Sequence, residues 1–167
     1  MYKIKLIKNK YYVDDNNFHI LNEKGYGVKS DKFMYELNDY EVVYLLEFKK
    51  AQLINAKNEL IGTQSILKNK NFNVNIYYVY KNLREKGYIL KSGLKYGFTF
   101  RIYDKGIKPK DDHSLWLVEI FNENKRMYTK EIVRLNRIAH SVGKKTLLAI
   151  VDNENSITYI ETNWKRT

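Results

Sequence analysis

One short segment of this 167-residue chain constrains its fold more than any other. Residues 146–152, with the sequence TLLAIVD, form an almost unbroken apolar run. A half-buried strand alternates apolar and polar residues, so an unbroken run of strand length is typical of a strand with both faces buried. Residues 129–142, just before it, carry apolar side chains at helical spacing. The sequence therefore predicts a sheet covered by helices.

The other segments of the second half fit the same sheet. Residues 71–86 are predicted to form a helix that ends at Gly87, because glycine commonly ends helices. A polar loop, DKGIKPKDD, follows at 104–112. The order of one helix, three strands, a second helix and two strands predicts a mixed sheet flanked by helices. The predicted strands are 88–92, 98–103, 113–121, 146–152 and 156–162.

The first half has shorter and weaker patterns. A helix is predicted over 37–48, with Asn38 or Asp39 as its N-cap. Residues 56–70 are expected to form a second helix and a hinge. Short strands are predicted at 3–7, 11–13, 18–21 and 51–55. The predicted fold class is therefore α/β in the broad sense (α+β), with a small N-terminal α/β accessory domain at 1–70 and a C-terminal domain at 71–167.

Charge and composition indicate what kind of partner and which cellular compartment the chain is suited to. The formal net charge is +11, and residues 71–167 carry 18 basic against 10 acidic residues, compared with 12 against 9 in residues 1–70. The second half is thus the better candidate for binding a polyanion, although a lysine-rich solvated surface explains the charge equally well. The chain has no cysteine, no signal-peptide pattern at its start and no apolar run of membrane-spanning length. We therefore expect a cytoplasmic protein that does not use a membrane.

Metal chemistry has little support in the sequence. There are only three histidines, and they form no closely spaced pair. Glu119 is the nearest candidate for a magnesium ligand, but the preceding strand offers no acidic partner for it. No glycine-rich phosphate loop is present. We expect no cofactor, and a metal-dependent nuclease is the weaker enzyme hypothesis.

RNA can be cut without a metal, because its 2′-hydroxyl can attack the neighbouring phosphate. Such an enzyme needs a base for the hydroxyl, an acid for the departing 5′-oxygen and a cation for the charged phosphorane. Tyr103, His113 and Lys144 lie at predicted strand ends, where catalytic groups commonly gather. Each has an ordinary structural interpretation by itself. Tyrosine is also a poor base at neutral pH, since its ordinary pKa is about 10, and a neighbouring cation would help it ionise.

Three sequence blocks carry a resemblance to a known family. They are YKNLREKGYILKSGLKYGFTFRIYDKG at 80–106, HSLWLVEIF at 113–121 and RIAHSVGKKTLLAIVD at 137–152. In order and spacing they resemble the catalytic domain of the archaeal-type tRNA-splicing (tRNA-intron) endonucleases. The resemblance implies that residues 71–167 are a catalytic nuclease domain. It covers most of residues 80–152 and extends only weakly to either end.

The resemblance implies a role for each matching residue. Tyr103 corresponds to the general base, His113 to the general acid and Lys144 to the cation that stabilises the phosphorane, with Lys145 as the second candidate. His140 corresponds to a structural or RNA-contacting residue. Gly143 departs from the family pattern, in which this position is often basic, and we expect it to weaken the helix end and remove one RNA contact.

RNA recognition is implied in the same way. Arg137 corresponds to an arginine that stacks on a bulged RNA base together with a second flat group near the C-terminus. Trp164 is our candidate for that second group, and Arg166 is the alternative. Lys145 is also expected to bind RNA.

The implied activity is cleavage of precursor tRNA at a bulge-helix-bulge motif, leaving 2′,3′-cyclic phosphate and 5′-hydroxyl ends. The family acts as four-subunit assemblies, so a homotetramer or a heterotetramer with a structural subunit is expected. The turn from Asp152 to Glu154 corresponds to a loop that relatives insert into a neighbouring subunit, although an ordinary polar turn explains it equally well. Two alternatives stay open: a non-catalytic RNA-binding or structural subunit of the same assembly, and a metal-dependent nuclease.

Overall fold

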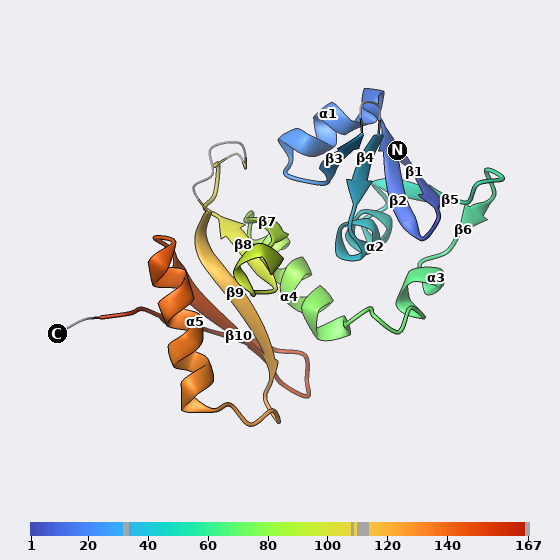
Figure 1. Cartoon of the computed structure of the whole chain (residues 1–167). Helices are drawn as coiled ribbons and strands as arrows, with labels where there is room; N and C mark the ends of the chain where they lie inside the picture. Colours follow the sequence, from blue (N-terminus) through green and yellow to red (C-terminus); the bar gives the residue numbers. More distant parts are fainter. Residues whose placement is uncertain (32–33, 108, 110–113, 166–167) are drawn as a thin grey trace. The chain divides into compact units, whose positions relative to one another are not determined.

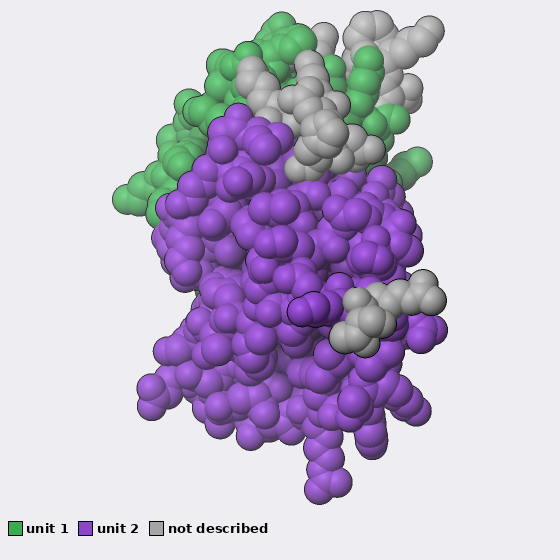
Figure 2. All heavy atoms as spheres, turned by 90° about the vertical axis from the view of Figure 1, so that its left-hand side faces the viewer, with its two compact units in different colours: residues 1–73 green, residues 74–167 purple. Residues whose placement is uncertain are grey.

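The computed structural model describes residues 1–31, 34–107, 109 and 114–165. The chain divides into two compact units, residues 1–73 and residues 74–167, which are coloured green and purple in Figure 2. Each unit contains one mixed β-sheet with helices (Figure 1). This architecture confirms the predicted α+β fold class. Among the described residues, no helix is both long enough and apolar enough to span a membrane.

Unit 1 is built on a six-stranded sheet with the order β3-β4-β2-β1-β5-β6. Among the ladders of its described residues, β1–β5 is parallel and the others are antiparallel. The strands are β1 (Tyr2–Ile7), β2 (Lys10–Asp14), β3 (Val28–Asp31), β4 (Met34–Leu37), β5 (Ala51–Ile54) and β6 (Leu60–Ile61). The helices are α1 (Asp15–Glu23), α2 (Asp39–Glu47) and α3 (Gln64–Leu67).

Helix α2 confirms the predicted helix and its cap. The Asn38 side chain accepts a hydrogen bond from the Glu41 backbone N–H, and the Glu41 carboxylate accepts one from the Asn38 N–H. This reciprocal pair is a capping box, which satisfies backbone donors that a helix start leaves without partners. The other Glu41 oxygen accepts from the Gly27 N–H at 3.0 Å. The buried carboxylate therefore ties the turn before β3 to the start of α2.

Two predictions in this unit were wrong. Residues 18–21 were predicted to form a strand but lie in α1, where Phe18 and Leu21 are buried while Ile20 is 48% exposed. Their spacing of three residues puts Phe18 and Leu21 on one helix face. The helix predicted over 56–70 is instead the hairpin strand β6 followed by the short helix α3.

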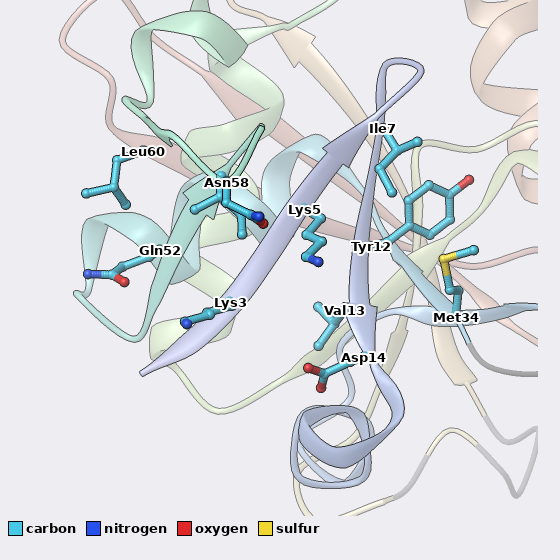
Figure 3. Close-up of a pocket in the computed structure, with 11 residues that line it drawn as sticks. Lys3, Lys5, Ile7, Tyr12, Val13, Asp14, Met34, Gln52, Asn58 and Leu60 are labelled. Atoms are coloured by element: carbon cyan, nitrogen blue, oxygen red, sulfur yellow. The ribbon is translucent and has the colours of Figure 1, made fainter. Parts of the chain in front are cut away.

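One hollow of unit 1 lies on its sheet (Figure 3). It measures about 600 Å³, and its walls include Lys3 and Lys5 of β1, Tyr12 of β2 and Gln52 of β5. Of the residues predicted to act in catalysis, the two that the structure describes, Tyr103 and Lys144, do not line it. The predicted site therefore has to be sought in unit 2.

Unit 2 is built on a five-stranded sheet with the order β11-β10-β9-β8-β7. The β9–β10 pair is parallel and the other pairs are antiparallel, which confirms the predicted mixed sheet. The strands are β7 (Ile89–Ser92), β8 (Phe100–Tyr103), β9 (Ser114–Asn122), β10 (Lys145–Val151) and β11 (Ile157–Thr162). The helices are α4 (Val74–Glu85), the 3-10 helix η1 (Leu94–Tyr96) and α5 (Thr129–Ser141).

The core of unit 2 confirms the interpretation of the TLLAIVD run. Leu148 packs in a buried cluster with side chains of α5, while Leu147 borders a small apolar cavity together with Leu83 of α4. Strand β10 thus meets helical residues on both faces. The buried cluster on the α5 side consists of Phe98, Leu117, Phe121, Leu135, Ala139 and Leu148.

Candidate active site

Tyr103 closes β8 and is fully buried. The β8–β9 ladder pairs Ile102 with Trp116 but Tyr103 with Ser114, so one extra residue, Leu115, bulges from β9. Bulges of this kind re-aim side chains at sheet edges and beside active sites. The guanidinium carbon of Arg101 lies 5.6 Å from the centre of the Tyr103 ring. The bulge thus sets Tyr103 beside Ser114, with a cation against its ring.

Lys144 lies between α5 and β10, and the end of α5 fixes its backbone. Its N–H donates to the Ala139 carbonyl at 2.9 Å, and the Gly143 N–H donates to the His140 carbonyl at 3.1 Å. Gly143 has a φ of 67°, in the left-handed region that favours glycine. These two bonds form a Schellman motif, a common way to close a helix. The expectation that Gly143 weakens the helix end was therefore wrong, because this closure uses a residue with positive φ.

The Lys144 side chain extends to β9, where its Nζ donates to the Ser114 carbonyl oxygen at 3.1 Å. Ser114 is also the register partner of Tyr103. The structure therefore brings Tyr103 and Lys144 to the same residue, although they are far apart in sequence. His113, the third predicted catalytic residue, immediately precedes Ser114 in the chain and lies outside the described residues.

Tyr96 also belongs to this site, and the sequence analysis did not single it out. The Lys144 Nζ lies 6.0 Å from the centre of the Tyr96 ring, and the Lys95 Nζ lies 4.7 Å from it. The tyrosine is in η1 and packs against the buried α5-side cluster. The glycines at 93 and 97 that flank it were a possible sequence signal, because they indicate a constrained loop at this point.

Lys145, the second candidate for the catalytic lysine, has other partners. Its Nζ donates to the Glu161 carboxylate of β11 at 3.0 Å. The same carboxylate accepts from the Trp116 indole N–H at 2.7 Å. The hydrogen bonds from Trp116 and then from Lys145 lower the pKa of Glu161 below its usual range. Lys145 is thus paired with β11, whereas Lys144 reaches Ser114, the residue opposite Tyr103.

The residues predicted to stack on an RNA base lie together. The Arg137 guanidinium carbon is 5.7 Å from the centre of the Trp164 ring, within the range of a cation–π contact. The His140 ring lies near the same indole, with 6.4 Å between ring centres. Trp164 is 38% exposed, and Arg137 is exposed on α5. Arg166, the alternative to Trp164, lies outside the described residues.

The sequence of unit 2 matches a known family model. Residues 73–159 match the model described as the tRNA intron endonuclease catalytic C-terminal domain. The chain belongs to the tRNA intron endonuclease family. The match includes Tyr103, His113, Arg137 and Lys144 but stops before Trp164.

Individual relatives extend the family match to most of the chain. The chain is 37% identical over 132 residues to a tRNA-splicing endonuclease of Methanothermobacter thermautotrophicus, and this match covers 78% of each of the two chains. It is 35% identical over 155 residues to a tRNA-splicing endonuclease of Pyrococcus furiosus, covering 90% of this chain and 86% of the relative. It is also 35% identical over 158 residues to that of Thermococcus kodakarensis, covering 92% of each. The similarity to endonucleases of this family thus reaches well into unit 1.

The acidic turn between β10 and β11 is shaped by Asp152. Its carboxylate accepts hydrogen bonds from the backbone N–H groups of Glu154 at 2.9 Å and Ser156 at 2.8 Å. Asn153, between the two acids, donates its N–H to Glu123 at 2.9 Å. Glu154 is exposed. Asp152 thus has an internal structural role in this family member, while Glu154 projects from the turn.

Glu119 stabilises the chain segment that enters β8. Its carboxylate accepts hydrogen bonds from the Thr99 N–H at 3.0 Å and the Thr99 hydroxyl at 3.3 Å, where it secures the chain entering β8. Burial raises the pKa of Glu119 above its usual range. Within the part of the chain that the structure describes, no three His, Asp or Glu side chains gather into a group that could hold a metal.

Proposed function

We propose that this protein is an endoribonuclease that removes introns from precursor tRNA by 2′-hydroxyl attack at the cut site. The observation that carries the proposal is the convergence of Tyr103 and Lys144 on Ser114 in a chain of the tRNA intron endonuclease family. The names of its relatives, tRNA-splicing endonucleases, support precursor tRNA as the substrate.

The proposed reaction needs three groups around one phosphate. Tyr103 accepts the proton of the 2′-hydroxyl, whose oxygen then forms a bond to phosphorus. The ammonium group of Lys144 stabilises the negative charge that develops on the phosphorane oxygens. His113 gives a proton to the departing 5′-oxygen as its bond to phosphorus breaks. The products are a 2′,3′-cyclic phosphate and a 5′-hydroxyl, and the chemistry uses no metal.

The surroundings of Tyr103 support its role as a base. A tyrosine in water is almost entirely protonated at neutral pH. A positive charge nearby favours the phenolate, and the Arg101 guanidinium carbon lies 5.6 Å from the Tyr103 ring centre. Burial has the opposite effect, because loss of water disfavours the charged phenolate, so the proposed role depends on the nearby cation. Tyr103 is fully buried.

We propose a bulge-helix-bulge motif as the RNA structure that is cut. In-line attack requires the 2′-oxygen, phosphorus and 5′-oxygen to be nearly collinear, which a regular A-form helix does not permit. A bulged nucleotide can adopt this geometry when its base is held outside the stack. Arg137 and Trp164 supply the flat groups on which unstacked bases are held. Because these two side chains contact each other at 5.7 Å, the base would displace this contact or stack on an outer face of the pair.

We further propose that the active enzyme is a tetramer, made either of identical chains or of this chain with a structural subunit. The exposed Glu154 at the tip of the acidic turn is suited to a basic surface of a neighbouring subunit. Asp152 supports this contact indirectly, because its carboxylate holds the turn in shape.

The test is to purify this chain alone, measure its mass in solution and assay it on a precursor tRNA that contains a bulge-helix-bulge. We expect cleavage by a tetramer, with cyclic phosphate ends on the products. A folded tetramer that binds the RNA but leaves it intact would favour the non-catalytic subunit instead. If activity appears only after a second subunit is added, Lys144→Ala in this chain separates the two explanations. Loss of the restored activity would support a heterotetramer in which this chain is catalytic, and full restored activity would place the catalytic residues in the other subunit.

A further inference from the structure

The loop that carries Tyr96 is built to hold one shape. The Gly93 carbonyl accepts hydrogen bonds from the N–H groups of Tyr96 at 2.9 Å and Phe98 at 3.2 Å. A Cβ atom at Gly93 would lie 2.8 Å from the Phe100 backbone carbonyl, so any other residue would push the loop away from β8. Gly97 ends the turn with a φ of 73°, in the left-handed region. Residues 93–97 thus form a fixed platform at the start of β8.

The platform presents one aromatic ring to the candidate site. Tyr96 is partly buried and packs on the apolar cluster between the sheet and α5. The Lys144 Nζ lies 6.0 Å from the ring centre, at the outer limit of a cation–π contact. Lys95 is closer, with its Nζ at 4.7 Å, so two ammonium groups share the ring. The leading alternative is that Tyr96 only packs the core and that its distance from Lys144 has no effect on cleavage.

Lys144 needs such support if its charge is to act at a defined point. A lysine side chain has four flexible carbon–carbon bonds and loses much rotamer freedom when it is fixed. Its ammonium group has three donors, of which the Ser114 carbonyl takes one at 3.1 Å. A ring face restricts the position of the ammonium without requiring a particular donor. The remaining donors can then point to a phosphate.

We propose that Tyr96 is a positioning residue, whose ring holds the Lys144 ammonium beside Ser114 for the cleavage step. The inference rests on the proposed function, since it assigns Lys144 to the phosphorane. It predicts that the ring face matters and that the hydroxyl does not. It also predicts that the effect of Tyr96 passes through Lys144 alone.

The experiment measures single-turnover cleavage of precursor tRNA by the full chain and five variants. Tyr96→Phe should cleave within about threefold of the natural rate, and Tyr96→Leu, which keeps apolar bulk but has no ring, should be about tenfold slower at unchanged RNA affinity. In the Lys144→Ala background, Tyr96→Leu should cause no further loss. Tyr128→Leu is the matched control, because Tyr128 has a lysine ammonium 5.7 Å from its ring but lies elsewhere, at the start of α5.

A second measurement detects the contact between Tyr96 and Lys144 independently of cleavage activity. The ring current of Tyr96 should shift the NMR signal of the Lys144 ε-methylene group, and the shift should persist in Tyr96→Phe and disappear in Tyr96→Leu. Full activity of Lys144→Ala, together with a normal ring-current shift of Lys144 in the natural chain, would reject the catalytic role of Lys144 and, with it, the positioning role. A tenfold loss from Tyr96→Leu that recurs in the Lys144→Ala background would reject positioning alone. Cleavage by Tyr96→Leu at the natural rate would also reject positioning. A rate loss in Tyr96→Phe as large as that in Tyr96→Leu would reject it too.

Discussion

The Lys144 Nζ donates a hydrogen bond to the Ser114 carbonyl oxygen at 3.1 Å, and Ser114 is the residue opposite Tyr103 in the β8–β9 ladder. Three strands create this relationship. Strand β9 lies between β8 and β10, so it receives Tyr103 from one side and the residue that precedes β10 from the other. A proposed base and a proposed phosphorane-binding cation therefore meet on a rigid sheet.

Removal of Tyr103 or Lys144, the two proposed catalytic groups within the described residues, should slow cleavage strongly without weakening RNA binding. We expect Tyr103→Phe and Lys144→Ala each to lose about a hundredfold in single-turnover rate, the usual scale of acid–base and charge stabilisation. His113→Ala should lose at least as much. The control is Lys145→Ala, which should stay close to the natural rate because Lys145 is paired with Glu161. Full activity of any one of the first three variants would remove that residue from the proposed site.

His140→Ala offers a second comparison, between His140 of α5 and the proposed acid His113. The His140 ring lies 6.4 Å from the Trp164 ring, centre to centre, whereas Lys144 reaches Ser114 of β9. We expect a rate loss well below that of His113→Ala, measured under the same conditions. A hundredfold loss from His140→Ala with normal RNA affinity would indicate that the acid has been assigned to the wrong histidine.

Stacking by Arg137 and Trp164 can be separated from simple charge. Arg137→Lys keeps the positive charge but loses the planar guanidinium. We expect Arg137→Lys and Trp164→Ala each to slow cleavage by one to two orders of magnitude, since stacking of one base is worth about 1–3 kcal/mol and about 1.4 kcal/mol corresponds to a factor of ten. Far-UV circular dichroism should show an intact fold. A natural cleavage rate for Arg137→Lys would mean that a charge contact with phosphate is enough.

The two acids of the β10–β11 turn should respond differently to substitution. Glu154→Lys reverses an exposed charge and leaves the hydrogen bonds of the turn in place, so it should shift the chain from tetramers to smaller species and reduce activity with it. Asp152→Asn removes a charge but keeps an oxygen that can accept the two backbone bonds, so assembly should be weakened less. Sedimentation velocity at several protein concentrations measures the fraction of tetramer for both variants. A Glu154→Lys tetramer as stable as the natural one would exclude the turn from assembly.

The helix end before Lys144 gives a stability prediction. Gly143→Ala puts a side chain at a φ of 67°, which should lower the free energy of unfolding by about 1 kcal/mol. Gly143→Asn should cost less, because asparagine tolerates this conformation. Urea denaturation followed by circular dichroism measures the difference. Equal stability of the alanine variant would show that the positive φ is not required there.

Much of the fold was readable from the sequence where local and tertiary signals agree. Asn38 and Glu41 specify the start of α2 through a capping box, and the TLLAIVD run specifies the central strand β10. Residues 18–21 were wrongly predicted to form a strand because the sequence FHIL has strand-like composition, although Phe18 and Leu21 lie on one face of a helix. No strand was predicted at 28–31 or 34–37, since these four-residue strands are too short to show a clear alternation.

The candidate site could be predicted only in part from the sequence, because its geometry depends on contacts between distant segments. Strand ends suggested Tyr103 and Lys144, but nothing in their spacing predicts that both would reach Ser114, because that depends on the β9 bulge and the parallel β9–β10 pair. Tyr96 gave even less signal among 15 tyrosines. Its position follows from the hydrogen bonds of the platform at 93–97, which only the structure reveals.

The most direct test of the central claim is cleavage of a bulge-helix-bulge precursor tRNA in excess EDTA, compared with the same RNA carrying a single 2′-deoxy sugar at the cut site. The proposed mechanism uses the substrate's own hydroxyl as nucleophile and a side-chain cation in place of a metal. The unmodified RNA should therefore be cut at its full rate to a 2′,3′-cyclic phosphate and a 5′-hydroxyl, while the deoxy RNA should bind and stay intact. Loss of cleavage in EDTA that magnesium restores, or cleavage of the deoxy RNA, would contradict the account.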